Sequence, residues 1–134
     1  MSKSLLIAIV DDDVAVRAAL FDLLEVEGLP ARTFESGTSL LAEGAPEGFD
    51  CVITDVRMPE IDGLELQQRL RAHGSAIPVI FITSSRDETM RAQALRDGAA
   101  AWFTKPVANG ALLAALRLAL GRRDAGNAHG AQGE

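Results

Sequence analysis

The sequence predicts an α/β fold: one doubly wound parallel sheet of five strands with helices on both faces. Short apolar runs alternate along the chain with segments of helical periodicity. Parallel strands require helical crossovers of this kind. The apolar runs are continuous rather than alternating, which is typical of strands covered on both faces. The length of 134 residues fits a single domain.

Each of five apolar runs is followed by a predicted helix. The first run, Leu-Leu-Ile-Ala-Ile-Val, ends in three aspartates, which are suited to cap a helix. Gly28, Gly98 and Gly121 follow three of the helical segments and are typical C-terminal stops. The strands are expected at residues 5–10, 31–34, 51–54, 78–82 and 100–103, and the helices at residues 14–27, 37–41, 64–73, 88–97 and 111–120.

These elements place the domain at residues 1–121. Residues 122–134 are rich in Gly and Ala and have no apolar periodicity, so we expect a flexible C-terminal tail or a linker there.

The composition excludes several classes of function. The net charge is −6 and the 13 Lys and Arg residues are scattered, so we expect this domain to bind no nucleic acid. No apolar run approaches the roughly 20 residues of a membrane span or fits a signal-peptide core. The single cysteine, Cys51, excludes a disulfide framework and a multi-cysteine metal site. We expect a soluble, cytoplasmic protein without membrane contacts.

Polar residues stand at the predicted carboxyl ends of four strands. Asp11 and Asp12 follow the first strand, Asp55 the third, Thr83 the fourth and Lys105 the fifth. We expect the flavodoxin-like strand order 2-1-3-4-5, in which the first and third strands are neighbours at the switch point where ligands bind. Asp11 or Asp12 would then lie close to Asp55.

This set of residues suits phosphoryl transfer to a carboxylate. Carboxylates in one crevice repel one another unless a cation offsets their charge, and Mg²⁺ prefers oxygen ligands. Asp55 would be the nucleophile, Lys105 a fixed positive charge and Thr83 a hydroxyl donor. Each residue alone has a simpler explanation, such as a helix cap or a turn. Four strand ends converging on one edge favour a functional site.

Four blocks together resemble the receiver domain of two-component response regulators, in the CheY-like superfamily. The blocks are Ile-Val-Asp-Asp-Asp at residues 9–13, Ile-Thr-Asp-Val-Arg-Met-Pro with Asp-Gly at 53–63, Phe-Ile-Thr-Ser-Ser at 81–85, and Lys-Pro at 105–106. The match covers residues 5–120. The resemblance implies a phosphoacceptor in a phosphorelay, which catalyses only its own phosphorylation and slow dephosphorylation and is not a true enzyme.

The resemblance also implies the roles of the acidic residues. Asp55 would accept the phosphoryl group from a phosphohistidine on a sensor histidine kinase. Asp11, Asp12, Asp55 and the backbone carbonyl of Arg57 would hold Mg²⁺. Asp12 and Asp55 would be the direct carboxylate ligands.

A switch built from Thr83 and Trp102 is implied in the same way. Thr83 would move inward to bond a phosphoryl oxygen, and Lys105, joined to Pro106 by a cis bond, would pair with another. Trp102 stands three residues before Lys105, where the family has a Tyr or Phe that rotates inward. An indole is bulkier and its N–H needs a partner when buried, so Trp102 is interpreted either as a rotating residue or as a fixed part of the strand.

The resemblance implies partners on the face formed by the last two helices. An output domain or protein would read the change near residues 87–97 and 109–120. A phosphorylation-dependent homodimer through the same face is a further expectation.

Three other functions fit the sequence less well. Aspartyl phosphatases and dehalogenases commonly carry a second catalytic aspartate two residues after the nucleophile, where this chain has Arg57. A flavodoxin-like cofactor module needs phosphate donors in its first loop, and the aspartates at residues 11–13 would repel a phosphate. A degenerate receiver that only binds proteins would lack an expected site residue, and none is missing.

Overall fold

The computed structural model describes residues 5–42 and 48–132 of the chain, with side chains up to Gly121. Five strands form one parallel sheet in the order β2-β1-β3-β4-β5, so the predicted fold class and strand order are confirmed. The strands are β1 (Ile7–Val10), β2 (Ala31–Phe34), β3 (Cys51–Thr54), β4 (Val79–Thr83) and β5 (Ala101–Thr104).

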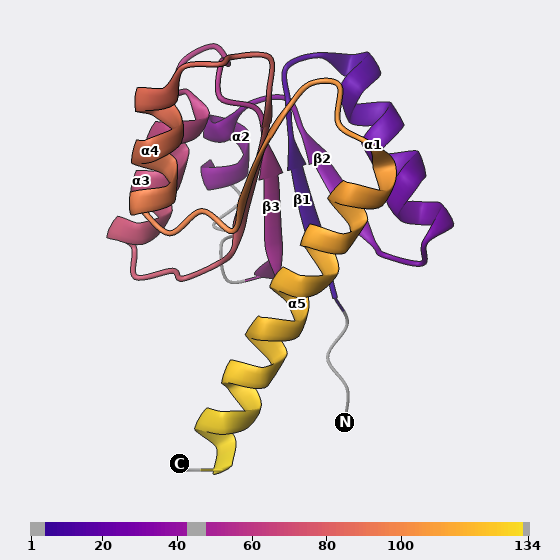
Figure 1. Ribbon diagram of the computed structural model, residues 1–134, viewed down its shortest axis with the longest axis vertical. Helices are drawn as coiled ribbons and strands as arrows, with labels where there is room; N and C mark the ends of the chain where they lie inside the picture. Colours follow the sequence, from indigo (N-terminus) through magenta and orange to yellow (C-terminus); the bar gives the residue numbers. More distant parts are fainter. Residues whose placement is uncertain (1–4, 43–47, 133–134) are drawn as a thin grey trace.

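Five helices cover the two faces of the sheet. They are α1 (Val14–Val26), α2 (Gly37–Ala42), α3 (Gly63–Ala72), α4 (Glu88–Arg96) and α5 (Asn109–Gln132). In Figure 1, α1 and α5 lie on one face, and α2, α3 and α4 lie on the other. Within the described ranges, no helix combines the length and the apolar character that crossing a membrane requires.

The sheet separates two apolar cores. One contains Leu24 from α1, Leu112 and Leu116 from α5, and inward residues of the central strands. The other contains Leu66 and Leu70 from α3 together with the aromatic residues Phe34, Phe49 and Phe81. Every residue of β1, β3 and β4 is buried, whereas the edge strands β2 and β5 are partly exposed. The continuous apolar runs therefore correspond to the strands covered on both faces.

Aspartate caps fix where three helices begin at the carboxyl end of the sheet. The Asp13 side chain accepts hydrogen bonds from the backbone N–H groups of residues 15 and 16 at the start of α1. Asp62 caps α3 and Asp87 caps α4 in the same way. Because a capped helix has a defined first turn, these aspartates set the residue at which each helix begins after the loop that precedes it.

The last helix is longer than the sequence predicts. Gly121 was expected to end it after residue 120, but α5 begins at Asn109 and continues to Gln132. A glycine in a helix interior costs only about 1 kcal/mol relative to alanine, so it need not stop a helix. Figure 1 shows this helix extending beyond the body of the domain. The assignment of residues 122–134 as a tail or linker stays a prediction.

Two side chains of α3 hold the C-terminal end of α4. Gln67 Nε2 donates to the carbonyl oxygens of Ala94 (3.2 Å) and Asp97 (3.4 Å). Arg71 Nε donates to Asp97 O at 3.0 Å and Nη2 to Gly98 O at 3.4 Å. Carbonyls at a helix C-terminus lack intrahelical partners and carry the negative end of the helix dipole. These bonds therefore fix α4 at one end.

Gly63 lets α3 start directly against β3. Its N–H donates to Val56 O at 2.7 Å. A Cβ atom at this position would collide with the carbonyl oxygen of Asp55 and would lie 3.1 Å from Phe81 Cε1. The first turn of α3 and the end of β3 are consequently held in close contact.

Gly63→Ala is expected to destabilise the domain by about 2–3 kcal/mol, because β3 and α3 must separate to admit the methyl group. Gly110→Ala is the matched control: no heavy atom lies within 4 Å of its added Cβ, and alanine favours a helix by about 0.5–1 kcal/mol over glycine. Urea unfolding of both variants measures the difference. Equal stability of the two variants would contradict this explanation of Gly63.

Candidate functional site

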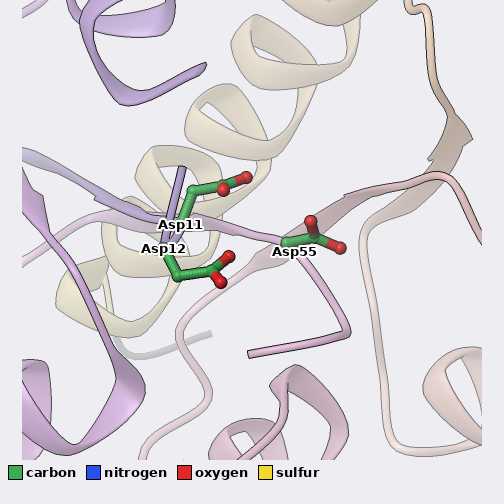
Figure 2. Close-up of side chains that lie close together, drawn as sticks. All are labelled: Asp11, Asp12 and Asp55. Atoms are coloured by element: carbon green, nitrogen blue, oxygen red, sulfur yellow. The ribbon is translucent and has the colours of Figure 1, made fainter. Parts of the chain in front are cut away.

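Three carboxylates lie together at the carboxyl end of the sheet, where β1 and β3 are neighbours (Figure 2). Asp11 and Asp12 follow β1, and Asp55 follows β3. One carboxylate oxygen of each lies within 4.8 Å of the others. Asp11 is 2% exposed and Asp55 8%, whereas Asp12 is exposed. The structure thus brings together the aspartates that the predicted strand order makes neighbours.

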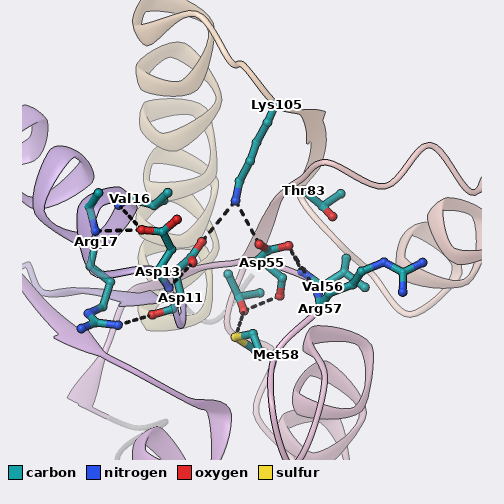
Figure 3. A network of polar contacts seen from close by, with 12 residues as sticks. Asp11, Asp13, Val16, Arg17, Asp55, Val56, Arg57, Met58, Thr83 and Lys105 are labelled. Atoms are coloured by element: carbon teal, nitrogen blue, oxygen red, sulfur yellow. Dashed lines mark hydrogen bonds and ion pairs between the residues drawn. The ribbon is translucent and has the colours of Figure 1, made fainter.

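Lys105 connects two of these aspartates from the loop after β5 (Figure 3). Its Nζ lies 3.0 Å from Asp55 Oδ2 and 3.5 Å from Asp11 Oδ2. Burial by itself would lower the pKa of Lys105, but the hydrogen bond and the charge of Asp55, together with Asp11, outweigh it and raise the pKa. Lys105 is therefore positively charged throughout the neutral pH range. The bond between Lys105 and Pro106 is cis, as the sequence resemblance implies.

The buried position of Asp11 disfavours its charged form. Desolvation raises the pKa of this carboxyl, and the charges of Asp55 and Asp12 act in the same direction. The backbone N–H of Asp13, which donates to Asp11 Oδ1 at 2.9 Å, and the charge of Lys105 lower the pKa by less, so the net shift is upward. Burial therefore disfavours the charged form of Asp11 more than its hydrogen bond and Lys105 favour it.

Both oxygens of the Asp55 carboxylate are oriented by hydrogen bonds. Oδ1 accepts from the backbone N–H of Val56 at 2.6 Å and from that of Arg57 at 3.4 Å, and Oδ2 accepts from Lys105. The hydroxyl of Thr54 donates to the carbonyl oxygen of Asp55 at 2.8 Å. The Arg57 side chain is exposed and points away from the carboxylates in Figure 3. Asp55 therefore has a defined orientation at the end of β3.

Thr83 and Trp102 lie on the adjoining strands. Thr83 is fully buried at the last position of β4, and its Oγ1 accepts a hydrogen bond from the backbone N–H of Ser85 at 3.1 Å. Trp102 is partly buried on β5, and its ring centroid lies 5.5 Å from that of Phe81. Thr83 ends the strand next to β3, which Asp55 follows, and Figure 3 shows both at this edge of the sheet. Trp102 lies on the side of the sheet that faces α4.

Sequence reasoning missed one residue that contacts this site. Arg17, in the first turns of α1, donates from Nη1 to the carbonyl oxygen of Asp11 at 2.6 Å. The spacing of four residues from the Asp13 cap is visible in the sequence. The acceptor, however, is a backbone carbonyl, which every residue has. The sequence therefore does not show that Arg17 binds the carbonyl of Asp11.

The donor set fits a hard divalent cation. Three carboxylates offer oxygen ligands within one small volume, and Mg²⁺ typically binds one or two carboxylates plus waters and phosphate oxygens. Since Asp12 is exposed, the cluster is accessible to water and to a phosphorylated ligand. The pKa of Asp11 is raised first by burial and then by the charges of Asp55 and Asp12, and a bound cation would offset the part that comes from these charges.

Comparison with known proteins assigns the chain to a family. The family model described as the response regulator receiver domain matches residues 7–117. The chain is 42% identical over 122 residues to the transcriptional regulatory protein FixJ of Azorhizobium caulinodans, covering 91% of this chain and 58% of FixJ. It is 44% identical over 114 residues to the response regulator protein TmoT of Ectopseudomonas mendocina, covering 85% of this chain and 52% of TmoT. The chain spans about half the length of these relatives.

A similar solved structure is also a receiver domain. The CheY-like receiver domain protein of Methanospirillum hungatei superposes with a TM-score of 0.84 at 26% identity, over 91% of this chain and 98% of that one. The chain belongs to the response regulator receiver domain family of two-component systems.

Lys105→Met is expected to lower stability at pH 7 by about 1–2 kcal/mol, because Asp11 and Asp55 lose the cation that offsets their repulsion. The raised pKa of Lys105 means that its contribution is complete below the ordinary lysine value of 10.5 and is lost as the pH rises through the raised pKa. Towards acid pH the difference shrinks as the Asp11 carboxyl, whose pKa is raised by burial, is protonated.

Urea unfolding of the metal-free protein between pH 4 and pH 11 measures this dependence. Arg91→Met, which removes an exposed cation on α4, serves as the control for net charge and should stay close to the parent. A Lys105→Met variant as stable as the parent at pH 7 would show that Lys105 does not offset the carboxylates.

Proposed function

We propose that this domain accepts a phosphoryl group on Asp55 from a phosphohistidine of a sensor histidine kinase, in a Mg²⁺-dependent reaction. The observation that carries the proposal is the Asp55 carboxylate at the switch point of the sheet, with Lys105 Nζ 3.0 Å from its Oδ2 and two further aspartates beside it. This arrangement supplies a nucleophile, a fixed positive charge and oxygen ligands for a cation in one place.

In the proposed step, a carboxylate oxygen of Asp55 attacks phosphorus as the bond between phosphorus and the imidazole nitrogen breaks. The product is an acyl phosphate, and the departing imidazole keeps the electron pair and takes up a proton. Lys105 then pairs with a phosphoryl oxygen instead of the carboxylate. The backbone N–H groups of Val56 and Arg57 hold Oδ1 and so orient the nucleophile before the donor arrives.

Asp12 and Asp55 would hold Mg²⁺ directly, with Asp11 nearby and the backbone carbonyl of Arg57 as a further ligand. The cation, when bound, neutralises charge on the phosphoryl oxygens. The closeness of the three carboxylates supports this part of the proposal.

An apolar groove beside the site supports a protein as the phosphoryl donor. A cavity of about 510 Å³ lies next to Lys105 and is lined by the α1 residues Val16, Ala19, Leu20 and Leu23 together with Pro106 and Val107. A donor that reaches Asp55 from this edge covers the groove. Exposed Val14, 68% accessible, adds apolar surface at the start of the same helix, which suits contact with another protein.

The output of the domain would be read on α4, β5 and α5. Thr83 would move toward the phosphoryl group, and Trp102 would rotate inward as it does so. The relatives FixJ and TmoT are named as a transcriptional regulatory protein and a response regulator, which supports an output domain or partner that acts on transcription. A phosphorylation-dependent homodimer through this face and a cytoplasmic location belong to the same proposal.

Incubation with acetyl phosphate and Mg²⁺ is expected to add one phosphoryl group to the parent protein, measured by intact mass. Asp55→Ala should remain unmodified, because the acceptor oxygen is gone, and EDTA should prevent the reaction of the parent. Asp22→Ala, the same change at an exposed position on α1, should react like the parent.

Each failure of this experiment has a distinct meaning. Modification of Asp55→Ala would exclude Asp55 as the acceptor, and modification in EDTA would exclude the metal requirement. Rapid release of phosphate over many turnovers would favour a phosphatase over a stoichiometric phosphoacceptor. An unmodified parent would favour a receiver that acts through protein contacts alone.

Thr83→Ala is expected to keep most of the phosphorylation while losing the change in Trp102 fluorescence that accompanies it, because the hydroxyl that links the phosphoryl group to β5 is absent. Thr33→Ala, on the exposed part of β2, is the matched control and should keep the fluorescence change. If the parent is phosphorylated without any fluorescence change, Trp102 is a fixed part of the strand.

A further inference from the structure

We infer that Arg17 is a positioning residue for the acidic cluster: it holds the peptide group between Asp11 and Asp12 so that both carboxylates face Asp55. Its Nη1 donates to the carbonyl oxygen of Asp11 at 2.6 Å, a short contact for a hydrogen bond from a charged donor. Figure 3 shows the guanidinium reaching this carbonyl from the side opposite to Lys105. The inference deepens the proposed function and rests on its metal site.

The position of Arg17 follows from the cap of α1. Asp13 accepts from Ala15 N at 2.9 Å, which sets the first turn, and Arg17 N–H donates to Asp13 O at 3.0 Å one turn later. Long side chains on a helix point back toward its N-terminus. The guanidinium is therefore directed at the end of β1 by the same cap that starts the helix.

The peptide that Arg17 holds determines where Asp12 lies. Asp11 is fixed on two other sides, because its N–H donates to Phe34 O at 3.1 Å and its Oδ1 accepts from Asp13 N–H. Asp12 is exposed, and its side chain forms no hydrogen bond with the residues that the structure describes. Its placement thus depends on the orientation of the preceding peptide plane, which the bond from Arg17 restrains.

Arg17 has two effects on a bound cation, and they have opposite signs. Its positive charge near the cluster opposes cation binding through space, whereas its hydrogen bond preorganises two ligands for the cation. Partners that orient metal ligands typically change metal affinity by tenfold or more. The sign of the change in affinity on removing Arg17 therefore distinguishes a positioning residue from a purely electrostatic one.

The test compares Arg17→Met, which keeps a stem of similar size and removes the donor, with Arg17→Lys, which keeps a charged donor. Mg²⁺ affinity of the unphosphorylated protein is measured by titration calorimetry, and unfolding in urea is measured alongside. We expect Arg17→Met to bind Mg²⁺ about tenfold more weakly and Arg17→Lys to recover most of the loss. Arg91→Met changes net charge equally and should bind like the parent.

Unchanged or tighter binding by Arg17→Met would overturn the inference, as would a loss that Arg17→Lys does not reduce. If the parent itself binds no Mg²⁺, the metal site of the proposed function fails, and amide hydrogen exchange decides the role of Arg17. Faster exchange of the Asp13 N–H in Arg17→Met, with the rest of α1 unchanged, would support positioning. Unchanged exchange, or faster exchange along all of α1, would overturn it.

Discussion

The repulsion among carboxylates at the ends of β1 and β3 is the constraint on which the rest of the structure depends. Asp11 and Asp55 are nearly inaccessible to water, so solvent does little to screen their charges. Lys105 bonds to both, and it reaches them from the loop after β5. All five strands are parallel, so the end of β5 lies at the same edge of the sheet as the ends of β1 and β3.

The elements around this edge keep the charges close to one another. Gly63 allows α3 to begin in contact with the carbonyl of Asp55, and the Asp13 cap starts α1 immediately after the cluster. These contacts restrain the backbone on both sides of the cluster, so the like charges stay close together. A site with unbalanced negative charge responds strongly to a cation or to a change of charge on Asp55.

Helix α4 begins at the edge of the sheet that carries the aspartates, and side chains of α3 contact its C-terminal end. Gln67 and Arg71 bond to the carbonyls at its C-terminal end. Its N-terminal end follows the loop in which Thr83 Oγ1 accepts from Ser85 N–H and Asp87 caps the helix. Thr83 is therefore linked to the N-terminal end of α4, whereas the hydrogen bonds from α3 hold its C-terminal end.

The sequence by itself determined the five strands, their order and the set of residues at the strand ends, because continuous apolar runs and caps are local signals and parallel sheets allow few topologies. It did not reveal the length of α5, since a lone glycine such as Gly121 is a weak stop, nor the role of Arg17. Only the tertiary structure decided which backbone groups orient Asp55 and that Arg17 meets the carbonyl of Asp11. Backbone donors and acceptors are the same at every residue, so their pairing depends on how distant segments pack.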